Sequence, residues 1–197
     1  MTAEEKELIT GACKGEGACF GQLYDRHAPR IYRFIFLKTG NKNDTEDLTH
    51  EVFLAAWRTI KKYRAHENIP FTSWLYHIAR NRVIDYYRTT KKTISLDEIL
   101  KGNTLPVELM SEAHHTITNA LHSTFEMQII MNAVGRLNDD QQNVLIMRYV
   151  EDLSPKEIGS AIGKTASAVR VIQHRALKQL KIIIAQTNEN RIPHQTT

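Results

Sequence analysis

Apolar residues recur at intervals of three and four along most of this chain, and this spacing limits what it can fold into. One such stripe consists of Phe20, Leu23, Tyr24, His27, Ile31 and Phe34. Residues three or four apart share one face of an α-helix, whereas a half-buried β-strand needs alternation, of which there is little here. The pattern therefore predicts an all-α protein.

Helix boundaries can be placed from residues that start or interrupt helices. Pro29 falls inside the first long stripe, and we expect it to kink or split that helix. A second helix should begin at Asp44, which we interpret as its N-cap because acidic residues follow in the first turn. A third helix should run from Phe71 or Thr72 to about Arg88.

Residues 93–125 have a different composition from the segments on either side. They contain a Gly-Asn pair, a proline, four acidic residues and one lysine. We interpret this segment as a flexible acidic linker, long enough to hold two small helical bundles far apart. The expected organisation is an N-terminal bundle over 1–92, the linker over 93–125, a C-terminal bundle over 126–185 and a polar tail over 186–197.

Charge is distributed unevenly, although the net charge is only +4. Residues 44–51 hold four acids and no Lys or Arg, residues 58–92 hold nine Lys or Arg and two acids, and residues 165–185 hold four Lys or Arg and no acid. This distribution indicates one surface for a basic protein partner and two surfaces for nucleic acid.

The last two predicted helices form a helix-turn-helix pattern. Ser154, Pro155 and Glu157 make a capping box with proline at the first helical position, and Gly163 should end that short helix. The final helix has small residues over 166–168, which would allow close approach to a major groove, and then longer polar ones. From these residues alone, an ordinary helical hairpin with a solvated basic face remains an alternative. The outward residues that could reach DNA are Ser167, Arg170, Val171, Gln173, His174, Arg175 and Lys178.

Aromatic and basic residues alternate over 71–88. Such a surface could stack on unpaired bases while neutralising their phosphates. The alternative is that the aromatic residues are core, and we expect Trp74, Leu75 and Ile78 to pack inward. The remaining candidates for DNA contact lie on this helix and in the preceding loop: His66, Asn68, Phe71, Arg80, Asn81 and Arg82.

The helix that begins near Asp44 offers a possible protein-binding face. Asp47 and Glu51 are four residues apart and His50 lies between them, so the three share a face. Phe53 and Trp57 would be exposed beside them if the alanine and valine positions of this helix are buried. Acids next to exposed aromatics are typical of a protein interface, although a solvated acidic face remains an alternative.

The order of these segments resembles the extracytoplasmic-function (ECF) family of bacterial RNA polymerase sigma factors. The run DLTHEVFLAAW at 47–57 is similar to the part of region two that binds the polymerase clamp, and FTSWLYHIARN at 71–81 is similar to the part that melts the minus-ten element. The segment from Leu137 to Ala176 is similar to region four, which reads the minus-thirty-five element. Leu75 stands where housekeeping sigma factors carry a tryptophan, which implies weaker promoter melting.

The resemblance implies a sigma factor without enzymatic activity. It would bind the clamp helices and flap of core RNA polymerase and promoter DNA, and an anti-sigma factor would control it. The acidic linker would follow the RNA exit path. By position, the polymerase contacts would be Asp47, His50, Glu51, Phe53 and Trp57, the minus-ten contacts would be the six residues named above for 66–82, and the minus-thirty-five contacts would be the seven named for 167–178.

Other functional classes have little support in the sequence. A dimeric helix-turn-helix regulator that acts without polymerase would leave the acidic face and the aromatic-basic helix without a role. Enzyme motifs such as HExxH or a Gly-rich phosphate loop are absent, and the two cysteines and nine histidines do not form a metal-ligand pattern, so we expect no cofactor and no metal. With no apolar run of membrane length and no signal peptide over 1–7, we expect a cytoplasmic protein.

Overall fold

The computed structural model describes residues 2–63, 69–90, 130 and 132–189. Over these ranges it contains α-helices and one short 3₁₀ helix, with no strand, so the predicted all-α class is confirmed. The elements are α1 (Ala3–Lys14), α2 (Gly17–Thr39), α3 (Lys42–Thr59), η1 (Ile60–Lys62), α4 (Phe71–Thr90), α6 (Asp139–Tyr149), α7 (Pro155–Ile162) and α8 (Ala166–Glu189).

Helix starts follow from local capping chemistry. Asn138 caps α6 and Ser154 caps α7, and in both a side chain at the third helical position bonds back to the cap backbone. The predicted capping box of α7 is therefore confirmed. In α3 the cap is Asn41, whose side chain accepts a hydrogen bond from the backbone of Asp44. The prediction of Asp44 as N-cap was wrong because an earlier polar residue was available to start the helix.

Helix α2 continues through Pro29 without a break. Of the two outcomes predicted for Pro29, a kink or a split, the split is excluded. Pro29 is exposed, so its missing N–H leaves a carbonyl group on the outer side of the helix, where water can solvate it. The apolar residues on the opposite side of α2, including Leu23, Ile31 and Phe34, are buried and hold the helix in place.

The N-terminal bundle is built from α1 to α4 around an aromatic-rich core. Phe34 meets Tyr76 edge to face with ring centroids 5.3 Å apart, and both side chains are fully buried. Leu75 is fully buried, and the partly buried Trp74 packs against Phe71 with ring centroids 5.4 Å apart. The prediction that Trp74 and Leu75 pack inward is therefore confirmed.

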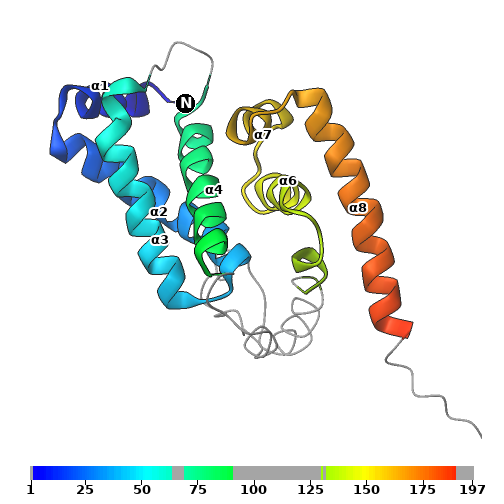
Figure 1. The fold of residues 1–197 in the computed structure, drawn as a ribbon. Helices are drawn as coiled ribbons and strands as arrows, with labels where there is room; N and C mark the ends of the chain where they lie inside the picture. Colours follow the sequence, from blue (N-terminus) through cyan, green and yellow to red (C-terminus); the bar gives the residue numbers. More distant parts are fainter. Residues whose placement is uncertain (1, 64–68, 91–129, 131, 190–197) are drawn as a thin grey trace, which may run out of the picture.

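The C-terminal bundle of α6, α7 and α8 lies against the N-terminal bundle (Figure 1). Helix α4 packs on α7, and α2 touches α6. One continuous core includes residues of both bundles, such as Tyr76 of α4 and Ile158 of α7. The linker length allowed the bundles to lie far apart, but in this structure they share an interface.

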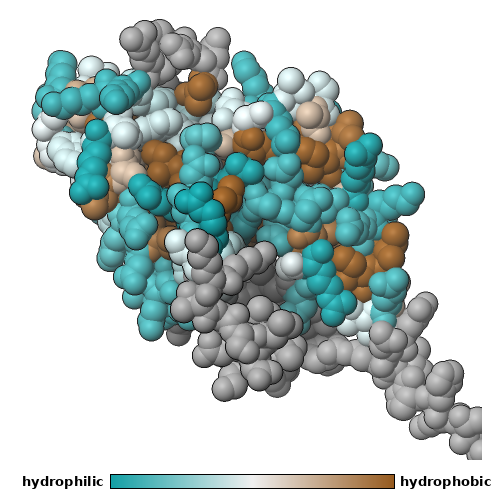
Figure 2. Space-filling model, in the orientation of Figure 1, coloured by the Kyte–Doolittle hydropathy of each residue, from teal (hydrophilic) through white to brown (hydrophobic). Residues whose placement is uncertain are grey.

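The surface is largely polar on the face shown in Figure 2, where apolar side chains form only small patches. Within the described ranges, none of the helices combines the length and apolar character needed to cross a membrane. The linker 93–125, its three histidines and most of the polar tail lie outside the described residues.

Candidate functional site

Helices α7 and α8 form the predicted helix-turn-helix. Gly163 ends α7 in the left-handed conformation with φ of 71°, which favours glycine. A Cβ atom at Gly159 would lie 2.5 Å from the carbonyl oxygen of Lys164, so only glycine lets the turn approach α7 this closely. Thr165 then caps α8 by accepting a hydrogen bond from the backbone of Ala168. These contacts fix the start of α8 relative to α7.

The outer face of α8 presents the side chains predicted to contact the minus-thirty-five element. Ser167, Arg170, His174 and Arg175 are exposed, and so are Lys178 and Val171. Gln173 is half-buried and donates a hydrogen bond to the hydroxyl of Tyr149. Helix α8 carries four basic side chains: Arg170, Arg175, Lys178 and Lys181. Among the described residues, none of them forms an ion pair, so no acidic side chain neutralises the positive charge of this face.

Helix α4 presents only part of the predicted minus-ten set. Asn81 is exposed and donates a hydrogen bond to the ring of His77, and Arg82 is half-buried. Phe71 is 1% exposed because its ring packs in the core against Tyr63, so the prediction that Phe71 contacts DNA is not compatible with this structure. His66 and Asn68 lie outside the described residues. Arg80 is paired within the protein, as described below.

The acidic face of α3 is exposed as predicted for Asp47, His50 and Glu51. Phe53 is not part of it. Its side chain is 4% exposed and its ring meets Tyr24 at a centroid distance of 4.7 Å, so the conditional prediction of an exposed Phe53 was wrong. The apolar residue on the exposed face is instead Leu54, the residue that follows Phe53.

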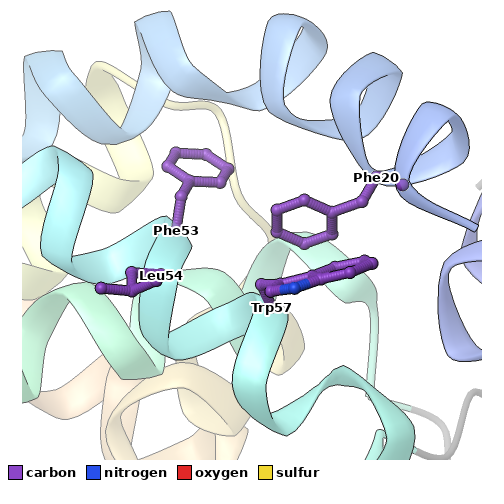
Figure 3. A pocket seen from close by; sticks show the side chains of 5 residues that line it. Phe20, Phe53, Leu54 and Trp57 are labelled. Atoms are coloured by element: carbon purple, nitrogen blue, oxygen red, sulfur yellow. The ribbon is translucent and has the colours of Figure 1, made fainter. Parts of the chain in front are cut away.

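Leu54 is 49% exposed, and sequence analysis did not select it. It lies three residues after Glu51 and four after His50, so helical spacing alone could have placed it on the acidic face. Beside it lies an open apolar pocket of about 340 Å³ between α2 and α3 (Figure 3). Phe20 and Trp57 form one wall, with ring centroids 4.9 Å apart. The pocket is lined by Gly17, Phe20, Phe53, Leu54 and Trp57.

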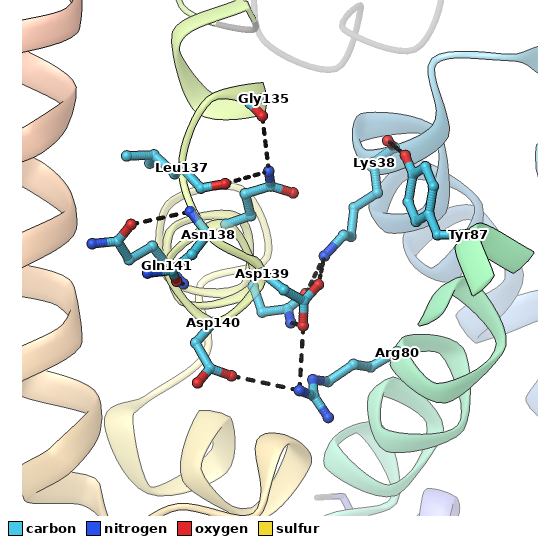
Figure 4. Close-up of polar contacts among 11 residues, drawn as sticks. Lys38, Arg80, Tyr87, Gly135, Leu137, Asn138, Asp139, Asp140 and Gln141 are labelled. Carbon is cyan, nitrogen blue, oxygen red and sulfur yellow. Dashed lines mark hydrogen bonds and ion pairs between the residues drawn. The ribbon is translucent and has the colours of Figure 1, made fainter. Parts of the chain in front are cut away.

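Four charged groups, Lys38, Arg80, Asp139 and Asp140, meet between the bundles at the start of α6 (Figure 4). Lys38 of α2 donates to Asp139 at 2.5 Å and Arg80 of α4 donates to Asp139 at 3.2 Å. Burial opposes ionisation of Asp139, but the hydrogen bond and positive charge of Lys38 outweigh it and hold the pKa of Asp139 below its ordinary value. Burial lowers the pKa of the Lys38 ammonium, whose side chain is 2% exposed.

A second charged cluster surrounds Glu151 in the turn after α6. Its side chain is fully buried and accepts hydrogen bonds from Arg30 at 3.0 Å and from Arg33 at 2.7 and 3.1 Å. Both arginines belong to α2. The sequence offered no sign of this contact, because more than a hundred residues separate the partners.

No group of three or more His, Cys, Asp or Glu side chains within the described ranges could hold a metal ion. Cys13 and Cys19 are free thiols, and burial raises the pKa of Cys13.

Two segments of the chain match regions of one protein family. Residues 23–93 match Sigma-70 region 2, and residues 133–181 match Sigma-70, region 4. The ECF RNA polymerase sigma factor SigX of Bacillus subtilis is 30% identical over 172 residues, which cover 82% of this chain and 81% of SigX. The chain belongs to the ECF family of RNA polymerase sigma factors.

Other members of the family are similarly related. The ECF RNA polymerase sigma factor BldN of Streptomyces coelicolor is 32% identical over 179 residues; the match covers 91% of this chain, which spans 65% of the length of BldN. The ECF RNA polymerase sigma factor SigW of Bacillus subtilis is 26% identical over 183 residues, with 89% of this chain and 94% of SigW covered. The family identified from the sequence is thus confirmed, and with it the role of a sigma factor in transcription initiation.

Solved structures support the fold of this sigma factor. CnrH, solved in complex with the cytosolic domain of CnrY, matches with a TM-score of 0.67 at 20% identity, over 93% of this chain and 98% of that chain. RpoE of Bartonella quintana, solved in complex with the anti-sigma factor NepR, matches with a TM-score of 0.63 at 17% identity, over 84% and 96%. At these identities the likeness speaks for the helical fold alone.

Proposed function

We propose that this sigma factor binds core RNA polymerase with its N-terminal bundle and directs the enzyme to promoters with α4 and α8. It acts in the cytoplasm and has no catalytic activity of its own. The observation that carries the proposal is that one chain presents two surfaces of opposite character: an acidic face with an apolar pocket on α3, and an acid-free basic face on α8. A regulator acting without polymerase needs only the second.

The acidic face of α3 would dock on the clamp helices of the polymerase. Asp47, His50 and Glu51 supply exposed polar groups, and the pocket beside them supplies apolar area. Leu54 and Trp57 replace Phe53 as the apolar contacts, because Phe53 is buried. Binding energy at protein interfaces concentrates in such partly enclosed aromatic and aliphatic groups, and surrounding charges favour the correct partner.

Helix α8 would enter the major groove of the minus-thirty-five element with its N-terminal half. Arg170 and His174 lie four residues apart on the exposed face, and Val171 is 49% exposed beside them. Arginine can bond guanine edges in two places, and an apolar side chain can contact the thymine methyl group. Arg175 and Lys178, farther along α8, would hold phosphates.

The minus-ten element would contact α4 and the loop before it. Asn81 is exposed, and Arg80 and Arg82 lie beside it on the same helix. His66 and Asn68 would contact the same element, as predicted from the sequence, whereas Phe71 is buried and would not. The domain limits would be those predicted from the sequence: 1–92, 93–125, 126–185 and 186–197. The acidic linker 93–125 would follow the RNA exit path of the polymerase. The C-terminal bundle would also contact the polymerase flap.

An anti-sigma factor is part of the proposal. RpoE of Bartonella quintana was solved with the anti-sigma factor NepR, and CnrH with the cytosolic domain of CnrY. A partner that covers the acidic face of α3 would prevent polymerase binding.

Run-off transcription tests the proposal. Core polymerase with and without the purified protein is given a template that carries the promoter of its own gene. A transcript that requires the protein is the expected result. If no transcript forms, although the same core polymerase is active in a control reaction, the proposal is contradicted.

A further inference from the structure

Tyr149, the last residue of α6, is 58% exposed, more than any other large apolar or aromatic side chain within the described ranges. A single exposed tyrosine is common on protein surfaces and by itself indicates no function. The hydroxyl of Tyr149, however, accepts a hydrogen bond from Nε2 of Gln173 in α8 at 2.9 Å. An exposed side chain of α6 is therefore held by the helix proposed to read the minus-thirty-five element.

This hydrogen bond places the Tyr149 hydroxyl beside the N-terminal half of α8. Helix α6 packs on α8 (Figure 1), and a second hydrogen bond between the two helices lies farther along α8, at Gln179. Gln173 is three residues after Arg170 and directly precedes His174, so it lies at the edge of the face proposed to enter the major groove. The Tyr149 hydroxyl consequently borders that face.

The hydroxyl of Tyr149 can still donate a hydrogen bond. A tyrosine hydroxyl has one O–H donor and two acceptor lone pairs, and Gln173 uses only a lone pair. Tyrosine is among the side chains that bond phosphate oxygens of DNA, and such contacts position a protein on the duplex. Asp152, the exposed acid of the turn after α6, is paired with Arg148 at 3.7 Å, which lessens its repulsion of a phosphate.

The bond from Gln173 also orders Tyr149 before DNA arrives. Gln173 is half-buried, so it is a fixed anchor on α8 for the exposed ring. A side chain that is already ordered loses less conformational entropy on binding than a mobile one. Because the anchor belongs to α8, a phosphate contact of Tyr149 is tied to the position of the reading helix.

We propose that Tyr149 is a DNA-contact residue, whose O–H group donates to a backbone phosphate at the edge of the minus-thirty-five element, and that Gln173 positions it. The inference rests on the proposed function, because it requires α8 in the major groove. It adds a contact from α6 to those from α8. It also changes the role predicted for Gln173, which acts through Tyr149 and not by touching a base.

Tyr149→Phe in the full chain, assembled with core polymerase, tests this inference. The change removes one exposed oxygen atom and keeps the ring, so the circular dichroism spectrum should stay the same. Affinity for a duplex that carries the promoter should fall about tenfold, as expected for loss of a hydrogen bond to a charged group. The slope of log K against log salt should not change, because a neutral hydroxyl releases no counterion.

Tyr32→Phe is the matched control, measured at saturating core polymerase. The ring of Tyr32 stacks on Phe36 within α2 of the N-terminal bundle, with ring centroids 6.2 Å apart. The same hydroxyl group is removed, but far from α8 in sequence and on the other bundle. Promoter affinity should therefore equal that of the wild type.

A methylphosphonate scan locates the contact. Each phosphate of the minus-thirty-five element is replaced in turn by a neutral methylphosphonate, and promoter affinity is measured for the wild type and for Tyr149→Phe. At the phosphate that Tyr149 contacts, the difference between the two proteins should shrink to less than about twofold, and at other phosphates it should persist. Likewise, Gln173→Leu should weaken binding when Tyr149 is present and have little further effect in the Tyr149→Phe background.

Three results would overturn the inference. Equal promoter affinity of the wild type and Tyr149→Phe would show that the hydroxyl does not bind DNA. A loss of affinity that no single methylphosphonate removes would show that Tyr149 only supports α8. An undiminished effect of Gln173→Leu in the Tyr149→Phe background would show that Gln173 contacts DNA itself.

The wild-type chain separates this inference from the proposed function. A promoter complex and a transcript with the wild type, together with an unchanged affinity of Tyr149→Phe, refute the Tyr149 contact alone. If the wild type with core polymerase forms no promoter complex, the proposed function is refuted, and the inference that rests on it fails as well.

Discussion

Leu54 provides the sharpest test of where the polymerase docks. Its side chain is 49% exposed beside the apolar pocket of α3, so about half of it remains for a partner to bury. Full burial of a leucine side chain is worth about 1.5–3 kcal/mol, so the exposed half is worth about 1 kcal/mol. Leu54→Ala should therefore weaken core polymerase binding by roughly fivefold.

The assay is a titration of labelled core polymerase with the wild-type chain, with Leu54→Ala and with Ile182→Ala. Ile182 of α8 is 50% exposed, so its truncation removes a similarly exposed aliphatic side chain far from the pocket. Thermal unfolding should show little change for Leu54→Ala, because the side chain is only half-buried. Equal affinities of wild type and Leu54→Ala, or an equal loss with Ile182→Ala, would refute the assignment of the docking site.

Further predictions concern the charged and polar groups. Reversal of Asp47 and Glu51 to lysine should weaken core binding in a pull-down while leaving the circular dichroism spectrum unchanged, because both side chains are exposed. Arg170→Ala should cost ~1–3 kcal/mol in promoter affinity if it reads a base, or reduce the salt slope by about 1 if it holds a phosphate. Asn81→Ala should impair promoter opening, measured by permanganate reactivity, more than closed-complex binding. Burial lowers the pKa of His27 below its ordinary 6.5 despite the raising effect of a neighbouring carboxylate, so the unfolded chain binds a proton that the folded chain does not. The free energy of unfolding should then fall as pH drops below 6.5, and His27→Gln should flatten this dependence in urea titrations between neutral pH and about pH 5.5.

The sequence predicted α2, α3, α4, α7 and α8 in their order, because local chemistry sets them, and made no prediction for α1. The caps Asn138 and Ser154, and the left-handed turn at Gly163, depend on residues within four positions of each other. The continuous helix at Pro29 was not predicted, because it depends on Pro29 lying on the solvent-exposed side of α2, and neighbouring residues alone do not reveal this.

On the proposed protein-binding face, the exposure predicted for Phe53 was wrong. Phe53 was chosen for its aromatic ring, but Leu54 is the exposed neighbour. The exposed Asp47, His50 and Glu51 define the outward direction of α3, and Leu54 continues that direction by spacing of three and four. That prediction gave more weight to the aromatic character of Phe53 than to the position of Leu54 on the helix.

The interface between the bundles could not be predicted. Glu151 and its partners Arg30 and Arg33 are more than a hundred residues apart, and each reads from the sequence as an ordinary surface charge. Their burial follows only from packing of α4 on α7 and of α2 on α6. Ion pairs between residues so far apart leave no periodic pattern in the sequence from which they could be predicted.

The most direct test of the whole account is association of the purified chain with bacterial core RNA polymerase at low salt. The account predicts a stable complex of one sigma factor per core enzyme, which is lost when the charges of Asp47 and Glu51 are reversed. If no complex forms, although α8 still binds DNA, the chain is not a polymerase subunit and the account is wrong.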